Sequence, residues 1–180
     1  MAGRENRKGD FQINKILIIL ILCLLCGCSF IYDLTNFTVP NDEEFLQVIE
    51  SLDTPNKIVN YMAENFTTKV HPFYSPDPYI FWQLKEGDCN DFATFATFVA
   101  HYHGYEVYQI VVEASYGTPY KHVLGVFMED GYSYSDNCIY NDIHAETFEE
   151  IVNHHVKAWG IILYGYTVYD YNMNFIEGGK

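Results

Sequence analysis

The chain has 180 residues, of which 49% are apolar and 17% aromatic, so it is long enough to bury the core of one globular domain. Its charge is strongly acidic, with 24 Asp and Glu residues against 10 Lys and Arg. Because such a surface repels phosphate backbones and anionic lipid headgroups, the composition argues against nucleic-acid binding and against electrostatic membrane attachment.

The N-terminal segment resembles a secretion signal. A basic stretch ends at Lys15, and the apolar run that starts at Ile16 is short for a membrane-spanning helix but typical of a signal peptide. The run closes on Leu-Cys-Gly-Cys at residues 25–28, which resembles the lipobox of bacterial lipoproteins. The resemblance implies a signal peptide over residues 1–27 and a lipid on Cys28, which would anchor the protein on the extracytoplasmic face of the cell membrane. An uncleaved anchor helix is the alternative.

Only two of the five cysteines are expected in the folded domain. Cys23 and Cys26 would leave with the signal peptide and Cys28 would carry the lipid, which leaves Cys89 and Cys138. A disulfide between these two is one interpretation, because exported thiols tend to pair. The other interpretation is that Cys89 is a reactive thiol, and its local sequence favours this.

Three helices are predicted in the first half of the folded part. The stretch 41–55 has acidic residues in its first turn and apolar residues at helical spacing, and Pro55 opens a second helix. The segment 67–84 contains three prolines and is predicted to be an extended surface connection. Cys89 begins a third helix, which is buried on most sides and stops at Gly104.

The hydrophobic pattern changes from helices to strands after Gly104. Strands are predicted at residues 105–113, 121–128, 132–136 and 158–171. Between the last two strands, Thr147 and Glu150 form a capping box for a short helix. Helices followed by an antiparallel meander indicate an α+β fold.

The position of Cys89 favours chemistry at its thiol. At the start of a helix, unpaired backbone N–H groups and the positive end of the helix dipole favour thiolate over thiol. His122 lies near the start of a predicted strand and is the candidate base.

A carboxylate partner for His122 follows from the predicted hairpin. A three-residue turn with Gly131 in the left-handed conformation would pair Met128 with Tyr132. Asp136 would then face the same side of the sheet as His122, one diagonal away. A two-residue Asp-Gly turn would instead put the two side chains on opposite faces.

Three motifs in this order resemble the core of the transglutaminase-like superfamily, a papain-like fold with a Cys-His-Asp triad. They are GDCNDFATF at 87–95, KHVLGVF at 121–127 and DGYSYSD at 130–136. The family pattern has a Gly-x-Cys helix start, a His at the beginning of a strand and an aromatic residue four positions ahead of the Asp. Tyr132 and Asp136 reproduce this last spacing.

The resemblance implies a tether over residues 28–40 and a transglutaminase-like domain over residues 41–180, with helices packed on an antiparallel sheet. It also implies a triad of Cys89, His122 and Asp136 that acts on peptide or protein amide bonds through an acyl-enzyme. The enzyme would be a cysteine peptidase, an amidase or a protein-glutamine acyltransferase, and it would need no cofactor or metal.

Several assignments stay open from the sequence. Gln83 or Trp82 is a candidate for the second oxyanion donor, beside the backbone N–H of Cys89. Asp142 and Asn137 are alternatives to the predicted carboxylate. The competing function is that of a non-catalytic lipoprotein that uses the same fold as a binding or scaffold module. The remaining histidines show no spacing typical of zinc ligands and are interpreted as surface or packing residues: His71, His101, His103, His144, His154 and His155.

Overall fold

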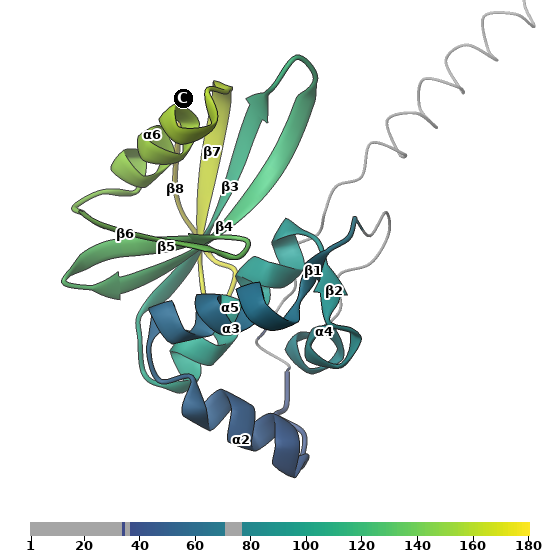
Figure 1. Cartoon of the computed structure of the whole chain (residues 1–180). Helices are drawn as coiled ribbons and strands as arrows, with labels where there is room; N and C mark the ends of the chain where they lie inside the picture. The colour runs from purple at the N-terminus through teal and green to yellow at the C-terminus, as the bar shows by residue number, and fades with distance from the viewer. Residues whose placement is uncertain (1–33, 35–36, 71–76) are drawn as a thin grey trace, which may run out of the picture.

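The computed structural model describes residues 34, 37–70 and 77–180. This part of the chain is a mixed α+β fold of five helices and a six-stranded antiparallel sheet, with a separate pair of two-residue strands (Figure 1). The predicted α+β class is therefore confirmed. The predicted signal peptide (1–27) and Cys28 lie outside the described residues. None of the described helices has the length and hydropathy needed to cross a membrane.

The two helices predicted ahead of Cys89 are present, and each begins with a side-chain cap. Helix α2 (Glu43–Ser51) follows Asp42, whose carboxylate accepts the N–H groups of Glu44 and Phe45 at 3.0 Å. Helix α3 (Pro55–Asn65) follows Thr54, whose hydroxyl group caps its first turn. Caps of this kind satisfy N–H groups that have no partner within the helix.

The prolines of residues 67–84 predict an extended connection, but the described part of this segment contains a helix. Strand β1 (Thr67–Thr68) pairs in parallel with β2 (Glu86–Gly87), and Pro78–Leu84 form helix α4. Pro78 occupies the first turn, where its missing N–H group costs nothing. Asp77 caps this helix by accepting the N–H of Ile80 at 2.7 Å, so the prediction was wrong because it took every proline as a helix breaker.

Helix α5 (Cys89–Tyr102) begins at the cysteine, as predicted. Its residues 90–100 are all buried, and Gly104 ends this region with a left-handed φ of 86°. The helix therefore lies in the interior, with its first residue only partly covered.

The main sheet has the strand order β6-β5-β4-β3-β7-β8, and all its neighbouring strands are antiparallel. Its strands are β3 (Val107–Ser115), β4 (Pro119–Glu129), β5 (Gly131–Asp136), β6 (Ile139–Ala145), β7 (Ile162–Asp170) and β8 (Phe175–Gly179). Four of these correspond to the predicted strands, whereas β6 and β8 were not predicted.

Helix α6 (Phe148–Trp159) is longer than the short helix that its capping box predicted. Thr147 caps it by accepting the N–H of Glu150 at 3.2 Å, as expected. Gly160, with a φ of 61°, ends it in the left-handed conformation. Residues 158–159 are therefore helical, and the strand predicted to start at 158 begins only at Ile162.

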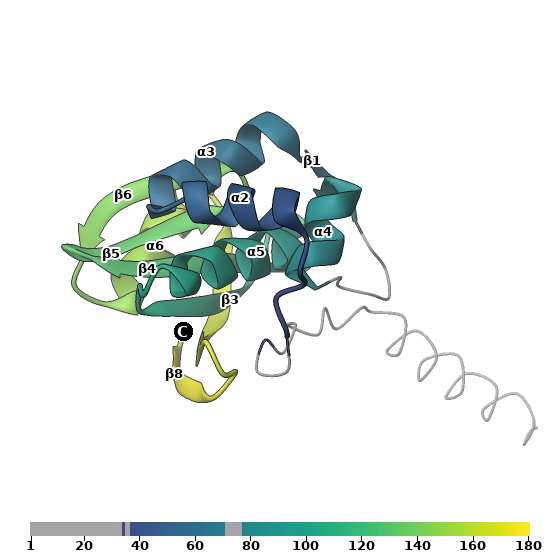
Figure 2. The ribbon, with the colours of Figure 1, turned by 90° about the horizontal axis from the view of Figure 1, so that it is seen from below.

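Two hydrophobic clusters form the core. The first is rich in aromatic rings and joins α2, α3, α4 and α5, and the second packs α6 against the sheet. Figures 1 and 2 show α6 separated from the other helices by β4 and β5. The sheet is thus covered by helices that come from two distant parts of the sequence.

Candidate active site

Cys89 is the first residue of α5, and a reciprocal capping box holds it in place. The Asp88 carboxylate accepts the N–H of Asn90 at 3.0 Å, and the Asp91 carboxylate accepts the N–H of Asp88 at 2.8 Å. Such a box satisfies the end of the helix from both sides. The thiol is therefore carried on a well-defined helix start and remains partly exposed.

Gly87 has a packing reason to be a glycine. A Cβ atom added there would lie 2.5 Å from Asp91 Oδ2 and 2.6 Å from the ring of Phe81. Both neighbours are buried. The Gly-x-Cys pattern thus lets α4 and the start of α5 approach one another closely.

Helix α5 also lies very close to the strand that carries His122. A Cβ atom on Gly125 of β4 would lie 2.8 Å from Ser135 Oγ and 3.4 Å from the backbone oxygen of Ala93 in α5. Gly125 follows His122 by only three residues. This close approach sets the position of the cysteine helix relative to β4.

His122 and Asp136 are hydrogen-bonded across the β4-β5 hairpin, as the predicted turn requires. Met128 pairs with Tyr132, and Gly131 has a left-handed φ of 89°. His122 Nε2 lies 2.7 Å from Asp136 Oδ1. The predicted register is therefore confirmed, and the imidazole and the carboxylate form a pair.

The charge state of His122 depends on its partners. Burial lowers the pKa of His122, but hydrogen bonds with Asp136 and Cys89 outweigh burial and raise the pKa to about 10. The imidazole is therefore positively charged at neutral pH. The contribution from Cys89 means that the thiol group lies within interaction distance of the ring.

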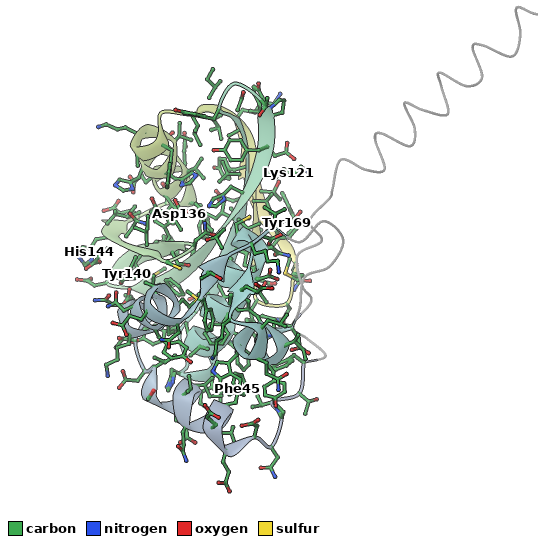
Figure 3. The ribbon with its side chains drawn as sticks, turned by 45° about the vertical axis from the view of Figure 1, so that its right-hand side comes forward. Phe45, Lys121, Asp136, Tyr140, His144 and Tyr169 are labelled. Carbon is green, nitrogen blue, oxygen red and sulfur yellow. The ribbon has the colours of Figure 1, made fainter. Side chains whose placement is uncertain are left out.

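Asp136 is almost fully buried, with 4% of its surface exposed, and it is nevertheless ionised. Burial raises the pKa of Asp136, but its contacts with His122 and His155 outweigh burial and hold the pKa below its usual value. Figure 3 shows Asp136 near the middle of the molecule, whereas the exposed His144 lies at its edge.

Two residues of α6 reach Asp136, and both were missed from the sequence. Trp159 Nε1 donates a hydrogen bond to Asp136 Oδ2 at 2.6 Å. His155 Nδ1 lies 3.2 Å from the same oxygen, close enough for electrostatic attraction but not aligned as a hydrogen bond. The His155 ring also stacks on that of His122, with centroids 5.2 Å apart and planes 3° apart.

The interpretation of His155 as a surface or packing residue is therefore incomplete, since its side chain faces the candidate site. His155 and Trp159 are four residues apart, a spacing that puts them on one face of a helix. This signal was hidden because Trp159 was assigned to the following strand.

The alternative orienting groups lie elsewhere. The exposed Asp142 carboxylate pairs with His144 at 3.4 Å. Asn137 adopts a left-handed φ of 49° in the turn between β5 and β6. Asp136 is thus the predicted acidic residue that reaches His122.

The two candidates for the second oxyanion donor, Trp82 and Gln83, are neighbours in α4. The Trp82 indole donates its N–H to Tyr61 Oη at 3.0 Å, within the aromatic cluster of the helices. This donor is engaged with Tyr61, and the role of either residue as an oxyanion donor stays a prediction. Gln83, the next residue in α4, has an exposed side chain.

No disulfide joins Cys89 and Cys138, and both are free thiols. Cys138 packs against the helical cluster, and burial raises the pKa of its thiol. The structure therefore contradicts the disulfide interpretation. The two thiols also differ in their surroundings, since Cys89 lies beside the His122 imidazole and Cys138 lies among apolar side chains.

His122, Asp136 and His155 are also the described residues with the donor set for a metal ion, since their ligand atoms lie within 4.8 Å of one another. Both carboxylate oxygens, however, already have partners, Oδ1 in His122 and Oδ2 in Trp159. A zinc ion would need bonds of about 2.0–2.2 Å to each ligand and would replace these contacts. The observed spacing fits a hydrogen-bonded acid-base group.

Comparisons with known proteins add no family. No protein-family model matches the chain, and no curated protein has significant sequence similarity to it. The site is therefore interpreted from its own residues.

Proposed function

We propose that this protein is a thiol enzyme of the transglutaminase-like, papain-like class, in which Cys89 attacks an amide or ester carbonyl group. The observation that supports this most directly is the 2.7 Å contact between His122 and Asp136, with Cys89 interacting with the same imidazole. A nucleophile, a proton carrier and an orienting carboxylate are the groups that acyl transfer through a covalent intermediate needs.

The geometry gives each nitrogen of His122 a separate task. Nε2 is engaged with Asp136, so Nδ1 is the nitrogen that remains for proton exchange with Cys89. Because the pKa of His122 is raised to about 10, its imidazole carries a proton at neutral pH. His122 is therefore ready to act as an acid when the sulfur attacks.

The reaction then has two halves. The Cys89 sulfur forms a bond to the carbonyl carbon, and the tetrahedral intermediate collapses as the leaving amine takes the proton from His122. Neutral His122 next removes a proton from the acceptor, whose oxygen or nitrogen attacks the thioester and releases the Cys89 thiolate. The proton ends on His122, which restores the starting state.

The oxyanion of the tetrahedral intermediate needs a donor near the thiolate. The backbone N–H of Cys89 lies at the start of α5, where N–H groups have no partner within the helix. We assign this group to the oxyanion. Water as the acceptor would make the protein a peptidase or amidase, and an amine would make it an acyltransferase, with hydrolysis favoured because water is always present.

We also propose that Cys28 carries a lipid that anchors this enzyme outside the cytoplasm. The support is the short apolar run that ends in Leu-Cys-Gly-Cys. Replacing Cys28 with Ser should abolish metabolic labelling with a radioactive fatty acid. Unchanged membrane retention and migration of the variant would favour an uncleaved anchor helix instead.

The function is tested by acyl-enzyme formation. The purified protein is incubated at pH 7 with a panel of peptide amides and activated esters, with and without a primary amine acceptor, and the acylated species is sought by mass spectrometry. Acylation confined to Cys89, and retained in the control Cys138→Ala, is expected. If no substrate acylates Cys89, and iodoacetamide modifies it no faster than free cysteine, the non-catalytic binding module takes the place of this proposal.

A further inference from the structure

We propose that α6 contributes two positioning residues to this site. Trp159 holds the Asp136 carboxylate, and His155 holds the His122 ring. The inference rests on the proposed function, because positioning matters only if the Cys89–His122 pair reacts. It extends the site to a helix that no triad motif includes.

The first argument is the division of the carboxylate between two elements. Asp136 Oδ1 contacts His122 of β4, and Oδ2 accepts the indole N–H of Trp159 at 2.6 Å. A carboxylate with one held oxygen can still rotate about its last side-chain bond. With each oxygen held by a different element, the carboxylate plane is set, and Oδ1 stays directed at Nε2.

The second argument is burial. Asp136 is 4% exposed and His155 is 2% exposed, so neither can replace a lost protein contact with bulk water at little cost. Without the N–H of Trp159, the polar contact that remains for Oδ2 among the described residues would be the poorly aligned Nδ1 of His155. The α6 contacts therefore determine whether a buried charge is satisfied.

His155 has a different task from Trp159. Its ring lies parallel to that of His122 at 5.2 Å, so it limits the rotation of the imidazole that must serve both Cys89 and Asp136. It also faces Trp159, with ring centroids 6.4 Å apart. The two imidazoles are thus stacked, whereas the indole is tilted by 50° from the His155 ring.

The charged and titratable groups around Asp136 come from four elements. They are His122 and Tyr120 of β4, Tyr134 of β5, His155 of α6 and, through His122, Cys89 of α5. The Trp159 side chain does not ionise, so its replacement by Phe removes a hydrogen-bond donor to Asp136 without changing the charge. This makes Trp159→Phe the cleanest test of positioning.

The chain offers a matched control on the same helix. His154 precedes His155, is exposed and contacts Tyr134 Oη at 2.9 Å through its Nδ1. The pair His154→Gln and His155→Gln therefore compares the same substitution at adjacent positions of α6. Only the second removes a ring that faces Asp136.

The test combines the alkylation rate of Cys89 with the NMR signal of His122. Iodoacetamide modification of Cys89 is followed from pH 5 to 9 in the full chain, and the proton on His122 Nε2 is observed by NMR. We expect Trp159→Phe to lower the rate at pH 7 about tenfold, as expected for loss of a buried hydrogen bond to a charged group, and to shift the His122 signal. His155→Gln should act in the same direction and His154→Gln should match the wild type.

The outcomes separate the two proposals. If wild-type Cys89 reacts no faster than free cysteine, the proposed function fails and the positioning role falls with it. If wild-type Cys89 is activated while Trp159→Phe and His155→Gln keep its rate, pH profile and His122 signal, the role of α6 is overturned and the function stands. If Trp159→Phe does not fold, the NMR signal of the Trp159 indole N–H is compared between the wild type and Asp136→Asn. The signal is expected to shift, because this N–H donates to Asp136 Oδ2. An unchanged signal would refute the contact.

Discussion

Helices α5 and α6 approach the same hydrogen-bonded pair, and they differ in how they do so. Helix α5 presents its first residue, Cys89, whose backbone setting at a helix start gives it chemistry. Helix α6 presents side chains from its last two turns, His155 and Trp159, which touch the carboxylate without any such signature. The comparison teaches that a nucleophile at a helix start can be recognised from its place in the sequence. The residues that support it can be recognised only from their contacts in the folded structure.

The two helices also differ in burial of the residues that they bring. Cys89 is partly exposed, as a group that meets a substrate must be, whereas His155 is 2% exposed. We therefore expect changes on the α5 side to abolish the reaction outright, and changes on the α6 side to reduce it by degrees.

The largest effect is expected at Cys89. Cys89→Ala should eliminate turnover and acyl-enzyme formation and cost little stability, because Ala suits a helix and the lost sulfur is small. Activity on the same substrate and the melting temperature are measured together. Cys138→Ala is the matched control and should keep its activity, and full activity of Cys89→Ala would exclude the thiol mechanism.

The next effect is expected at the carboxylate. Asp136→Asn keeps the shape of the side chain but removes the counter-charge of His122 and presents an N–H group where an acceptor is needed. A loss of kcat/KM of about 10⁴ is expected by analogy with serine triads. Asp142→Asn, which changes an exposed carboxylate paired with His144, should be neutral, and the reverse result would contradict the hairpin register.

The pH dependence of stability should follow the His122–Asp136 pair. Because the pKa of His122 is raised from 6.5 to about 10 on folding, its contribution is complete below pH 6.5 and is lost as the pH rises through 10. The pKa of Asp136 is lowered, so its contribution is present above pH 3.8 and is lost as the pH falls. Urea unfolding from pH 6 to 10 checks the first part, and His122→Gln should flatten that decline.

The smallest effect is expected where α4 meets the start of α5. Gly87→Ala places a Cβ atom 2.5 Å from Asp91 Oδ2 and should destabilise the protein by about 1–3 kcal/mol. Gly117→Ala, in a turn with open space but a φ of 80°, is the comparison and should cost about 1–2 kcal/mol. Urea unfolding of both variants measures the difference. Equal stability of Gly87→Ala and the wild type would mean that this contact is not tight.

The sequence predicts the triad side of the site better than the side formed by α6. The α5 start, the β4-β5 register and the His122–Asp136 pair follow from local rules, since caps, turns and strand alternation act within a few residues. The start of α4 also has a local signal in Asp77 and Pro78, but the three prolines of residues 67–84 together favour an extended segment. The α6 contacts depend on how a distant helix packs, which no local pattern determines.

The most direct test of the central claim compares the two thiols within one molecule. Cys89 lies beside an imidazole, whereas burial raises the pKa of Cys138, so iodoacetamide at limiting concentration should distinguish them by mass spectrometry. We expect Cys89 to react about a hundredfold faster than Cys138 at pH 6, where an ordinary thiol is almost wholly protonated, and His122→Ala to abolish this preference. Equal rates for the two cysteines at pH 6, or a preference that survives in His122→Ala, would contradict the claim that His122 activates Cys89.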